Sequence, residues 1–137
     1  MTPVFCATTH NPPETYGDCL RACIASVLDK PSGEVPHFAH DGADAYTVLE
    51  RCRAYLRTMG LTVFVSQYPP VERSELFDMM SETNPDATYL LFGLVAEGGG
   101  HVVVCQGGRV VHNPALFGCW IVAPPPGGWL VWVVARV

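Results

Sequence analysis

The feature that most constrains the fold of this chain is a change of pattern near residue 87. Before it, apolar residues recur at helical spacing, and after it come short runs of β-branched and aromatic residues separated by glycine and proline. The expected strands lie at 88–95, 101–106, 109–113, 118–123 and 129–137. Helices first and strands afterwards favour an α+β fold with an antiparallel sheet over alternating βαβ units. Three tryptophans are expected to lie in these strands and to pack in the core or on a sheet face: Trp120, Trp129 and Trp132.

The first half of the chain contains one almost wholly apolar segment and one amphipathic segment. Residues 18–28 begin with Asp18, after which only Arg21 and Ser26 interrupt the apolar sequence. This pattern predicts a central helix enclosed by the rest of the domain. In residues 48–59 the apolar positions recur on one face, so a second helix is expected to end at Gly60. A short strand at 62–66 and a short helix at 72–81 are expected to follow.

Composition and charge limit the class of protein. A chain of 137 residues, 49% hydrophobic and 15% charged, suits a single domain over residues 1–137 with a full core. The net charge of −5 without basic runs argues against a nucleic-acid partner. No apolar run reaches bilayer length and the first ten residues lack signal-peptide order, so we expect no membrane partner and a cytoplasmic location. In that reducing compartment the 6 cysteines are expected as thiols, catalytic groups or ligands rather than disulfides.

The apolar helix begins with a cysteine, in the stretch "GDCLRACIASVL". The first N–H groups of a helix lack intrahelical partners and, with the macrodipole, favour negative charge, which lowers a cysteine pKa from about 8.5. Cys19 stands at this position, directly after Asp18, which is expected to serve as N-cap. Cys23 lies one turn deeper and is expected to be a core residue. Taken alone, a cysteine in the place of Cys19 is more often a small buried residue than a reactive thiol.

A histidine and an asparagine in the strand-rich half are candidates for a base and its orienting group. His101 begins a strand after three glycines, in "GGGHVVVC". A hairpin turn at 107–108 would return Asn113 to the His101 end of that strand. We expect the Asn113 side chain to accept a hydrogen bond from Nδ1 of His101, which would leave Nε2 facing the thiol. His112 should point the opposite way and is assigned no role.

The order of these motifs resembles the papain-like cysteine peptidases, particularly the branch of the bacteriocin-processing peptidases. That branch has an Asp-Cys helix start, a His followed by hydrophobic strand residues, and an Asp-Pro or Asn-Pro, matched here by "GDCLRACIASVL", "GGGHVVVC" and "VVHNP". Over most of its length the chain is also similar to small bacteriophage papain-like proteins with "GDC…ACIAS…VPHF" and "HVVV..GG.VVHNP". The resemblance implies a papain-like fold, in which the N-terminal central helix carrying Cys19 packs on an antiparallel sheet carrying His101 and Asn113.

The resemblance also implies a function. Cys19 would be the nucleophile, His101 the general base and then acid, and Asn113 the orienting residue of a thiol-dependent hydrolase that cleaves an amide, peptide or isopeptide bond. The substrate would be a protein or peptide, no cofactor or metal would be needed, and the location would be the host cytoplasm for a phage-encoded protein. The same triad would serve an acyltransferase or transglutaminase-like enzyme, in which an amine replaces water.

One departure from the family concerns the oxyanion hole. The family places a Gln a few residues before the catalytic Cys, and this chain has no Gln before Gln67. Of the residues in the preceding arm, "CATTHNPPETYG", Asn11 is the favoured substitute. Loss of one oxyanion donor typically costs about 10²–10³ in rate, so a catalytically weak papain-like binding protein is a further alternative.

A different class of function is metal binding. Cys19 and Cys23, together with His37 and His40, supply ligand types that suit zinc. The two cysteines lie four apart on a helix, however, and lack the usual spacing of a zinc knuckle. The sequence therefore favours a thiol nucleophile over a metal site.

Overall fold

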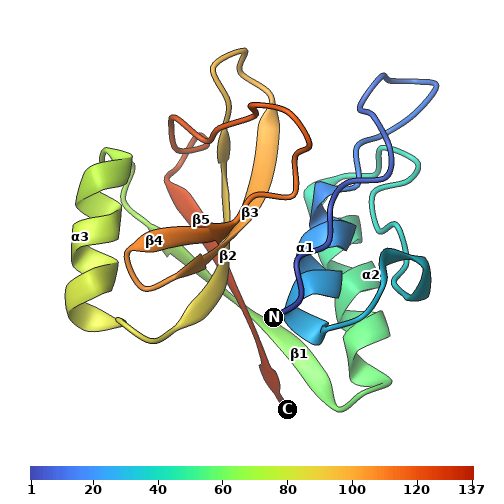
Figure 1. Ribbon diagram of the computed structural model, residues 1–137, viewed down its shortest axis with the longest axis horizontal. Helices are drawn as coiled ribbons and strands as arrows, with labels where there is room; N and C mark the ends of the chain where they lie inside the picture. The colour runs from blue at the N-terminus through green and yellow to red at the C-terminus, as the bar shows by residue number, and fades with distance from the viewer. The chain divides into compact units, whose positions relative to one another are not determined.

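The computed structural model describes residues 1–137 and is an α+β fold with three α-helices and a five-stranded antiparallel sheet (Figure 1). The helices are α1 (Cys19–Leu28), α2 (Ala45–Arg57) and α3 (Arg73–Thr83), with a 3-10 turn η1 (Ser32–Glu34). The strands are β1 (Leu61–Tyr68), β2 (Thr88–Leu94), β3 (Gly100–Gln106), β4 (Arg109–His112) and β5 (Trp129–Arg136). None of the helices has the length and apolar character that crossing a bilayer requires. The predicted α+β class is confirmed.

The chain forms two compact units. Unit 1 comprises Met1–Val63 and Val134–Val137, and unit 2 comprises Phe64–Val133. Unit 1 therefore contains α1, η1 and α2, whereas unit 2 contains α3 and the strands β2, β3 and β4. The boundary falls inside β1 and β5. The single domain expected from the chain length stays a prediction.

Within unit 1, α1 is as thoroughly buried as its apolar sequence predicts. Six of its residues are buried, and the run from Ala22 to Ala25 has no exposed surface. The helix ends at Leu28, and the next residue, Asp29, adopts the left-handed conformation (φ 55°, ψ 41°) that Asp tolerates better than most residues. The N–H groups of Asp29 and Lys30 then donate to carbonyl oxygens of the last turn, so the C-terminus of α1 is closed by its own backbone.

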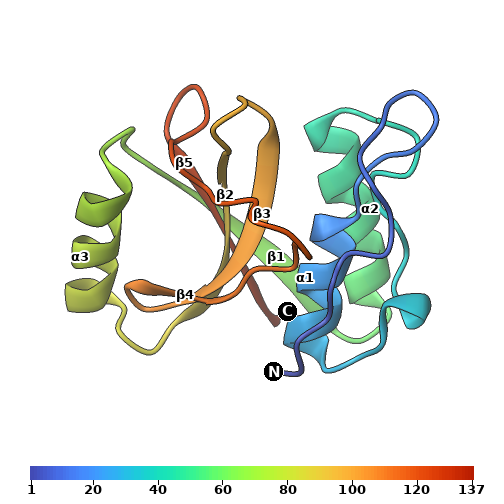
Figure 2. The same ribbon diagram turned by 45° about the horizontal axis from the view of Figure 1, so that its top comes forward.

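The N-terminal arm, residues 1–8, runs beside α1 in both views of the ribbon (Figures 1 and 2). Polar side chains of α1 and its flanking residues anchor it. The anchors are Thr2 Oγ1 to Asp29 Oδ1 (3.0 Å), Val4 N to Ser26 Oγ (2.9 Å) and Ala7 N to Asp18 Oδ1 (2.9 Å). The arm therefore begins at the C-terminal end of α1 and reaches the start of the helix at residues 7–8.

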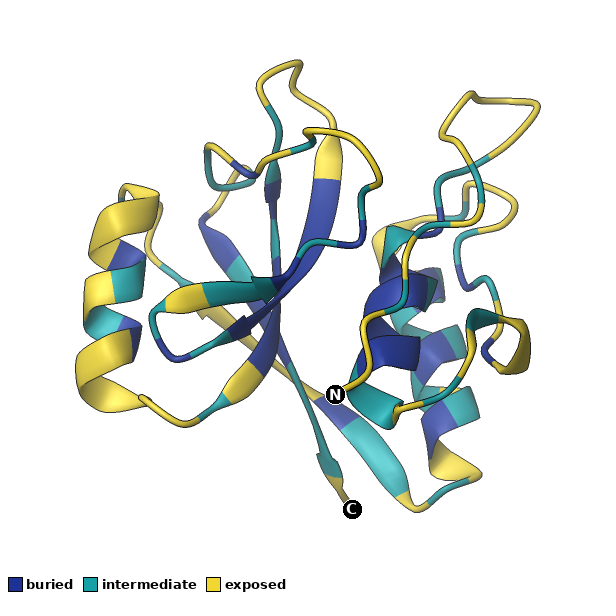
Figure 3. Cartoon of the chain, viewed as in Figure 1, coloured by how far each residue is buried: buried dark blue, intermediate teal, exposed yellow.

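In unit 2 the sheet has one face covered by α3 (Figure 1), and its strand order is β1-β5-β2-β3-β4. Five of the seven residues of β3 are buried, and the strand is mostly dark blue in Figure 3. The core between α3 and the sheet consists of Leu76, Met80, Tyr89, Leu91, Val103, Cys105, Ile121, Trp129 and Val131. This packing makes β3 a rigid element on which a functional side chain can be held.

The hairpin of β3 and β4 contains a β-bulge. A two-glycine turn joins the strands as predicted, but the register shifts after the first pairs. Cys105 lies opposite Val110, whereas Val104 lies opposite His112, so Val111 is an extra residue in β4. The bulge changes which face of the sheet the following residues occupy.

The segment 118–123 is not a strand, and this prediction is wrong. Both sides of β2 are already occupied, since β3 and β5 pair with it. The segment meets β2 only beyond its pairing with β5, in a single bridge between Leu94 and Ala123. The guanidinium of Arg73 also donates a hydrogen bond to the carbonyl oxygen of Ile121 at 2.7 Å. The apolar pattern of this segment therefore marks a loop that packs at the end of the central strand β2, and not a further strand of the sheet.

Candidate functional site

The structure brings His101 and Asn113 together within unit 2. Nε2 of His101, on β3, lies 2.8 Å from Oδ1 of Asn113, which directly follows β4. His101 is buried, with 7% of its surface exposed. The expected neighbourhood of these two residues is therefore present as a direct hydrogen bond.

The β-bulge decides which face of the sheet Asn113 occupies. Residues opposite one another in an antiparallel pair share a face, and faces alternate along each strand. Counting back from the turn in an unshifted register, Asn113 would stand opposite Val102, on the face away from His101. Continued one residue beyond β4, the shifted register brings Asn113 opposite Val103, which shares the face of His101. His101 and Asn113 are neighbours as predicted, and the bulge, which was not predicted, places them on the same face.

The amide of Asn113 is held in one orientation by two backbone groups. Its Nδ2 donates to the carbonyl oxygen of Cys119 at 2.8 Å, and its Oδ1 accepts from the N–H of Ala115 at 3.1 Å. The atom facing His101 is therefore an oxygen, which only accepts, so Nε2 of His101 carries the proton. The expectation that Nδ1 bonds Asn113 is wrong, and in the neutral ring Nδ1 is the basic nitrogen.

Burial also sets the charge of His101. Desolvation lowers the pKa of its imidazole below the ordinary 6.5, because an imidazolium loses hydration in the interior. The hydrogen bond to Asn113 opposes this shift only in part. His101 is therefore neutral near pH 7, with a lone pair on Nδ1, which is the state a general base needs.

A glycine stands opposite His101 in the neighbouring strand. Gly93 pairs with His101 in the β2–β3 register. A side chain at this position would collide with Ile121 and Trp129. The sequence carried a signal for this site, because a glycine inside a strand often marks a close approach of another segment.

Cys19 lies in unit 1 as the first residue of α1 and is partly exposed. Cys23, one turn later, has no exposed surface, as expected of a core residue. The structure records all 6 cysteines as thiols. His101 and Asn113 belong to unit 2. That Cys19 shares one site with them is therefore part of the proposal made below.

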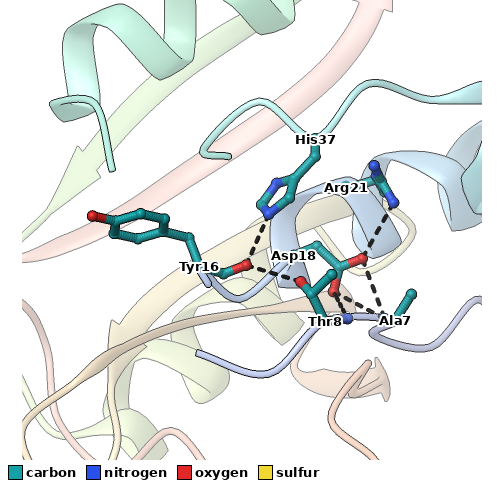
Figure 4. Close-up of polar contacts among 6 residues, drawn as sticks. All are labelled: Ala7, Thr8, Tyr16, Asp18, Arg21 and His37. Atoms are coloured by element: carbon teal, nitrogen blue, oxygen red, sulfur yellow. Dashed lines mark hydrogen bonds and ion pairs between the residues drawn. The ribbon is translucent and has the colours of Figure 1, made fainter. Parts of the chain in front are cut away.

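Asp18 occupies the N-cap position of α1 but does not cap the helix with its side chain, which corrects the expectation (Figure 4). Its Oδ1 instead accepts from the backbone N–H groups of Ala7 at 2.9 Å and Thr8 at 3.0 Å. Its Oδ2 lies 3.6 Å from a guanidinium nitrogen of Arg21. The Asp18 side chain is wholly buried, so the arm supplies the hydrogen bonds that a buried carboxylate requires. Single-residue reasoning missed this contact because its donors are backbone groups.

The turn before α1 is also fixed from two sides (Figure 4). The carbonyl oxygen of Tyr16 accepts from Thr8 Oγ1 at 2.8 Å and lies 2.8 Å from His37 Nε2. His37 thus uses one ring nitrogen to support the turn. No group of three or more His, Cys, Asp or Glu side chains in residues 1–137 is arranged to hold a metal ion.

Asn11, the predicted oxyanion donor, lies in the arm of unit 1 and is exposed. Its backbone pairs with Thr15 in both directions, at 3.0 and 3.1 Å, which closes a small hairpin around Pro12 and Pro13. The structure therefore places Asn11 in a defined loop shortly before Cys19 in the chain. Its oxyanion role stays a prediction.

The loop after Asn113 displays apolar side chains, and its exposed part is yellow in Figure 3. Trp120 is 61% exposed, so its predicted core or sheet packing is wrong, whereas Trp129 and Trp132 are buried in β5 as expected. The other exposed side chains of the loop are Leu116, Phe117 and Val122. The carbonyl oxygen of Cys119, in the same loop, accepts the hydrogen bond from the Asn113 side chain. The loop with the exposed side chains is therefore in direct contact with the partner of His101.

The chain was compared with protein-family models, with curated proteins and with solved structures, and nothing matches in any of the three. Function is therefore inferred from the geometry of the chain's own residues and from its motifs. Two local arrangements are informative. One is the thiol at the start of α1, and the other is the oriented and neutral His101 beside Asn113.

Proposed function

We propose that the protein is a papain-like, thiol-dependent hydrolase that cleaves an amide, peptide or isopeptide bond in a protein or peptide. Cys19 is the nucleophile, His101 the general base and acid, and Asn113 the orienting residue. The observation that carries the proposal is the His101–Asn113 hydrogen bond, in which the Asn113 amide is itself held by two backbone groups. The fixed Asn113 oxygen holds the imidazole with its proton on Nε2, which is the role of the orienting residue in such a triad.

The chemistry follows from the proton on Nε2. Nδ1 of His101 takes the proton of the Cys19 thiol, and the sulfur attacks the substrate carbonyl carbon. Nδ1–H then protonates the amine as the C–N bond breaks, which leaves a thioester on Cys19. Water attacks this thioester after giving a proton to Nδ1, and the acid product leaves as the thiol reforms. Throughout, Oδ1 of Asn113 accepts the Nε2–H and stabilises the imidazolium whenever it forms.

The position of Cys19 supports the first step. The N-terminal end of α1 carries partial positive charge, which stabilises a thiolate at the first helical residue. Cys23 lies one turn away from that end and is fully buried, so it gains neither the charge effect nor access. The two thiols of α1 therefore differ in chemistry although they share one helix.

The proposal is tested with activated acyl donors. A mixture of short peptide 4-nitrophenyl esters should give a burst of nitrophenolate and a mass increase on the Cys19 peptide. Cys19→Ser should abolish both, and His101→Gln should lower the acylation rate by about 10²-fold or more, since general base catalysis supplies 10²–10⁴. An added primary amine identifies acyl transfer if the product is an amide and not the free acid. A burst that persists in Cys19→Ser, or no acylation of Cys19 at all, would overturn the proposal.

A further inference from the structure

Two helices of unit 1 begin after an aspartate at the N-cap, and the two aspartates act differently. Asp44, before α2, accepts a hydrogen bond from the N–H of Thr47 at 2.7 Å, which is ordinary N-capping. Asp18, before α1, makes no such bond to its own helix. The two aspartates occupy the same position, but only Asp44 caps its helix with its side chain.

The Asp18 carboxylate binds the N-terminal arm instead of its own helix. The backbone N–H groups of Ala7 and Thr8 both donate to Oδ1 of Asp18. The nitrogen of Ala7 also lies 3.2 Å from Oδ2. Thr8 is fixed in turn by its hydroxyl, which donates to the Tyr16 carbonyl oxygen. Asp18 is thus bound to a segment ten or more residues earlier in the chain, which is itself anchored along α1.

A carboxylate in the capping position would harm a reactive thiol in the next residue. It would accept from the first-turn N–H groups that favour a thiolate, and its charge would repel the ionised sulfur. The nearby Arg21 also fits a role in balancing this carboxylate, at 3.6 Å from Oδ2, although its buried Nε has no hydrogen-bond partner. The carboxylate is therefore bound by backbone N–H groups of the arm and faces the guanidinium of Arg21, and it accepts no backbone N–H of its own helix.

We infer that Asp18 is a positioning residue: the amides of Ala7 and Thr8 hold its carboxylate off the first turn of α1 and so keep its charge away from the Cys19 sulfur. This inference rests on the proposed function, in which Cys19 is the nucleophile. By this inference the N-terminal arm contributes to the candidate site, because it positions the Asp18 carboxylate. Asp44 needs no such arm, because no thiol follows it.

The test measures iodoacetamide alkylation of Cys19 against pH by peptide mass spectrometry. Ala7→Pro removes one of the two donors, so the carboxylate is released toward α1, and alkylation at pH 7 should slow about tenfold, the effect of one pKa unit. In the Asp18→Asn background, Ala7→Pro should have no such effect, because no charge remains to move. Thr8→Pro replaces Ala7→Pro if the latter does not fold. Ser26→Ala, which loosens the arm at Val4 only, and Asp44→Asn are the controls and should leave the rate unchanged.

The outcomes separate the two proposals. If wild-type Cys19 reacts only above about pH 8.5 and His101→Gln does not change its profile, the thiol is unperturbed and the proposed function fails. If the wild-type profile is perturbed and depends on His101, the proposed function keeps its support. In that case, an Ala7→Pro effect that is absent, or that persists unchanged with Asp18→Asn, overturns the role of Asp18 alone.

Discussion

The start of α1 and the β3–β4 hairpin supply different parts of the candidate site, and they are built by different means. At the start of α1, Cys19 owes its setting to its place in the helix and to a buried carboxylate bound by the adjacent arm. In the hairpin, the partner of His101 depends on a single extra residue in β4. The comparison teaches that helix position is robust to small changes in sequence, whereas strand register depends on every residue in the count.

The sharpest way to test the helix side of this comparison is to remove the two N-cap aspartates. Asp18→Ala removes a wholly buried carboxylate that accepts two backbone N–H groups of the arm, and should cost about 3 kcal/mol of unfolding free energy, since a hydrogen bond to a charged group contributes about 1.5–3 kcal/mol. Asp44→Ala removes one exposed cap and should cost about 1 kcal/mol. Urea denaturation of both variants measures the difference. Equal losses would show that the arm contacts of Asp18 are worth no more than an ordinary cap.

The hairpin side is tested by changing the residue count in β4. Insertion of one alanine after Val111 should turn Asn113 to the opposite face and break its bond to His101, with a rate of Cys19 acylation about tenfold lower or worse. Deletion of Val111 should keep Asn113 on the His101 face, because it removes the bulge and leaves the later pairs in place. The imidazole resonances of His101 in NMR spectra report the contact directly. A normal His101–Asn113 contact in the insertion variant would contradict the register argument.

A smaller effect is expected from pH. The pKa of His101 is lowered in the folded protein, so between that value and about 6.5 the unfolded chain binds more protons at this site. Stability should therefore fall as the pH drops below about 6.5, with a slope of at most about 1.4 kcal/mol per pH unit from this residue. The difference between wild type and His101→Gln in urea unfolding at pH 7.5, 6.5 and 5.5 isolates this contribution. A difference that does not change with pH would mean that burial leaves the His101 pKa unshifted.

Much of the secondary structure could be predicted from the sequence because it depends on local pattern. The apolar run of α1, the amphipathic spacing of α2 and the β-branched runs of β2, β3 and β5 each carry their own period. The segment 118–123 failed because its pattern is that of a strand while the sites beside β2 were already taken. Competition for a sheet position is a property of the whole sheet and leaves no mark in a short window of sequence.

The candidate site divides in the same way. The neighbourhood of His101 and Asn113 followed from a glycine turn and a count of residues, but the nitrogen that Asn113 contacts did not. That assignment needed the amide orientation, which the backbone of Ala115 and Cys119 sets. Backbone donors and acceptors are the same at every residue, so no side-chain pattern announces them.

The sequence by itself determined the class of fold, the thiol at a helix start and the return of Asn113 to the His101 end of the β3–β4 hairpin, because each depends on residue type and short spacing. Only the tertiary structure decided that a bulge turns Asn113 toward His101, that Nδ1 is the basic nitrogen, and that Asp18 binds the arm instead of its own helix. The physical reason is that each depends on which backbone and side-chain groups lie within reach in the folded chain, and backbone groups are the same at every residue, so no short window of sequence identifies them.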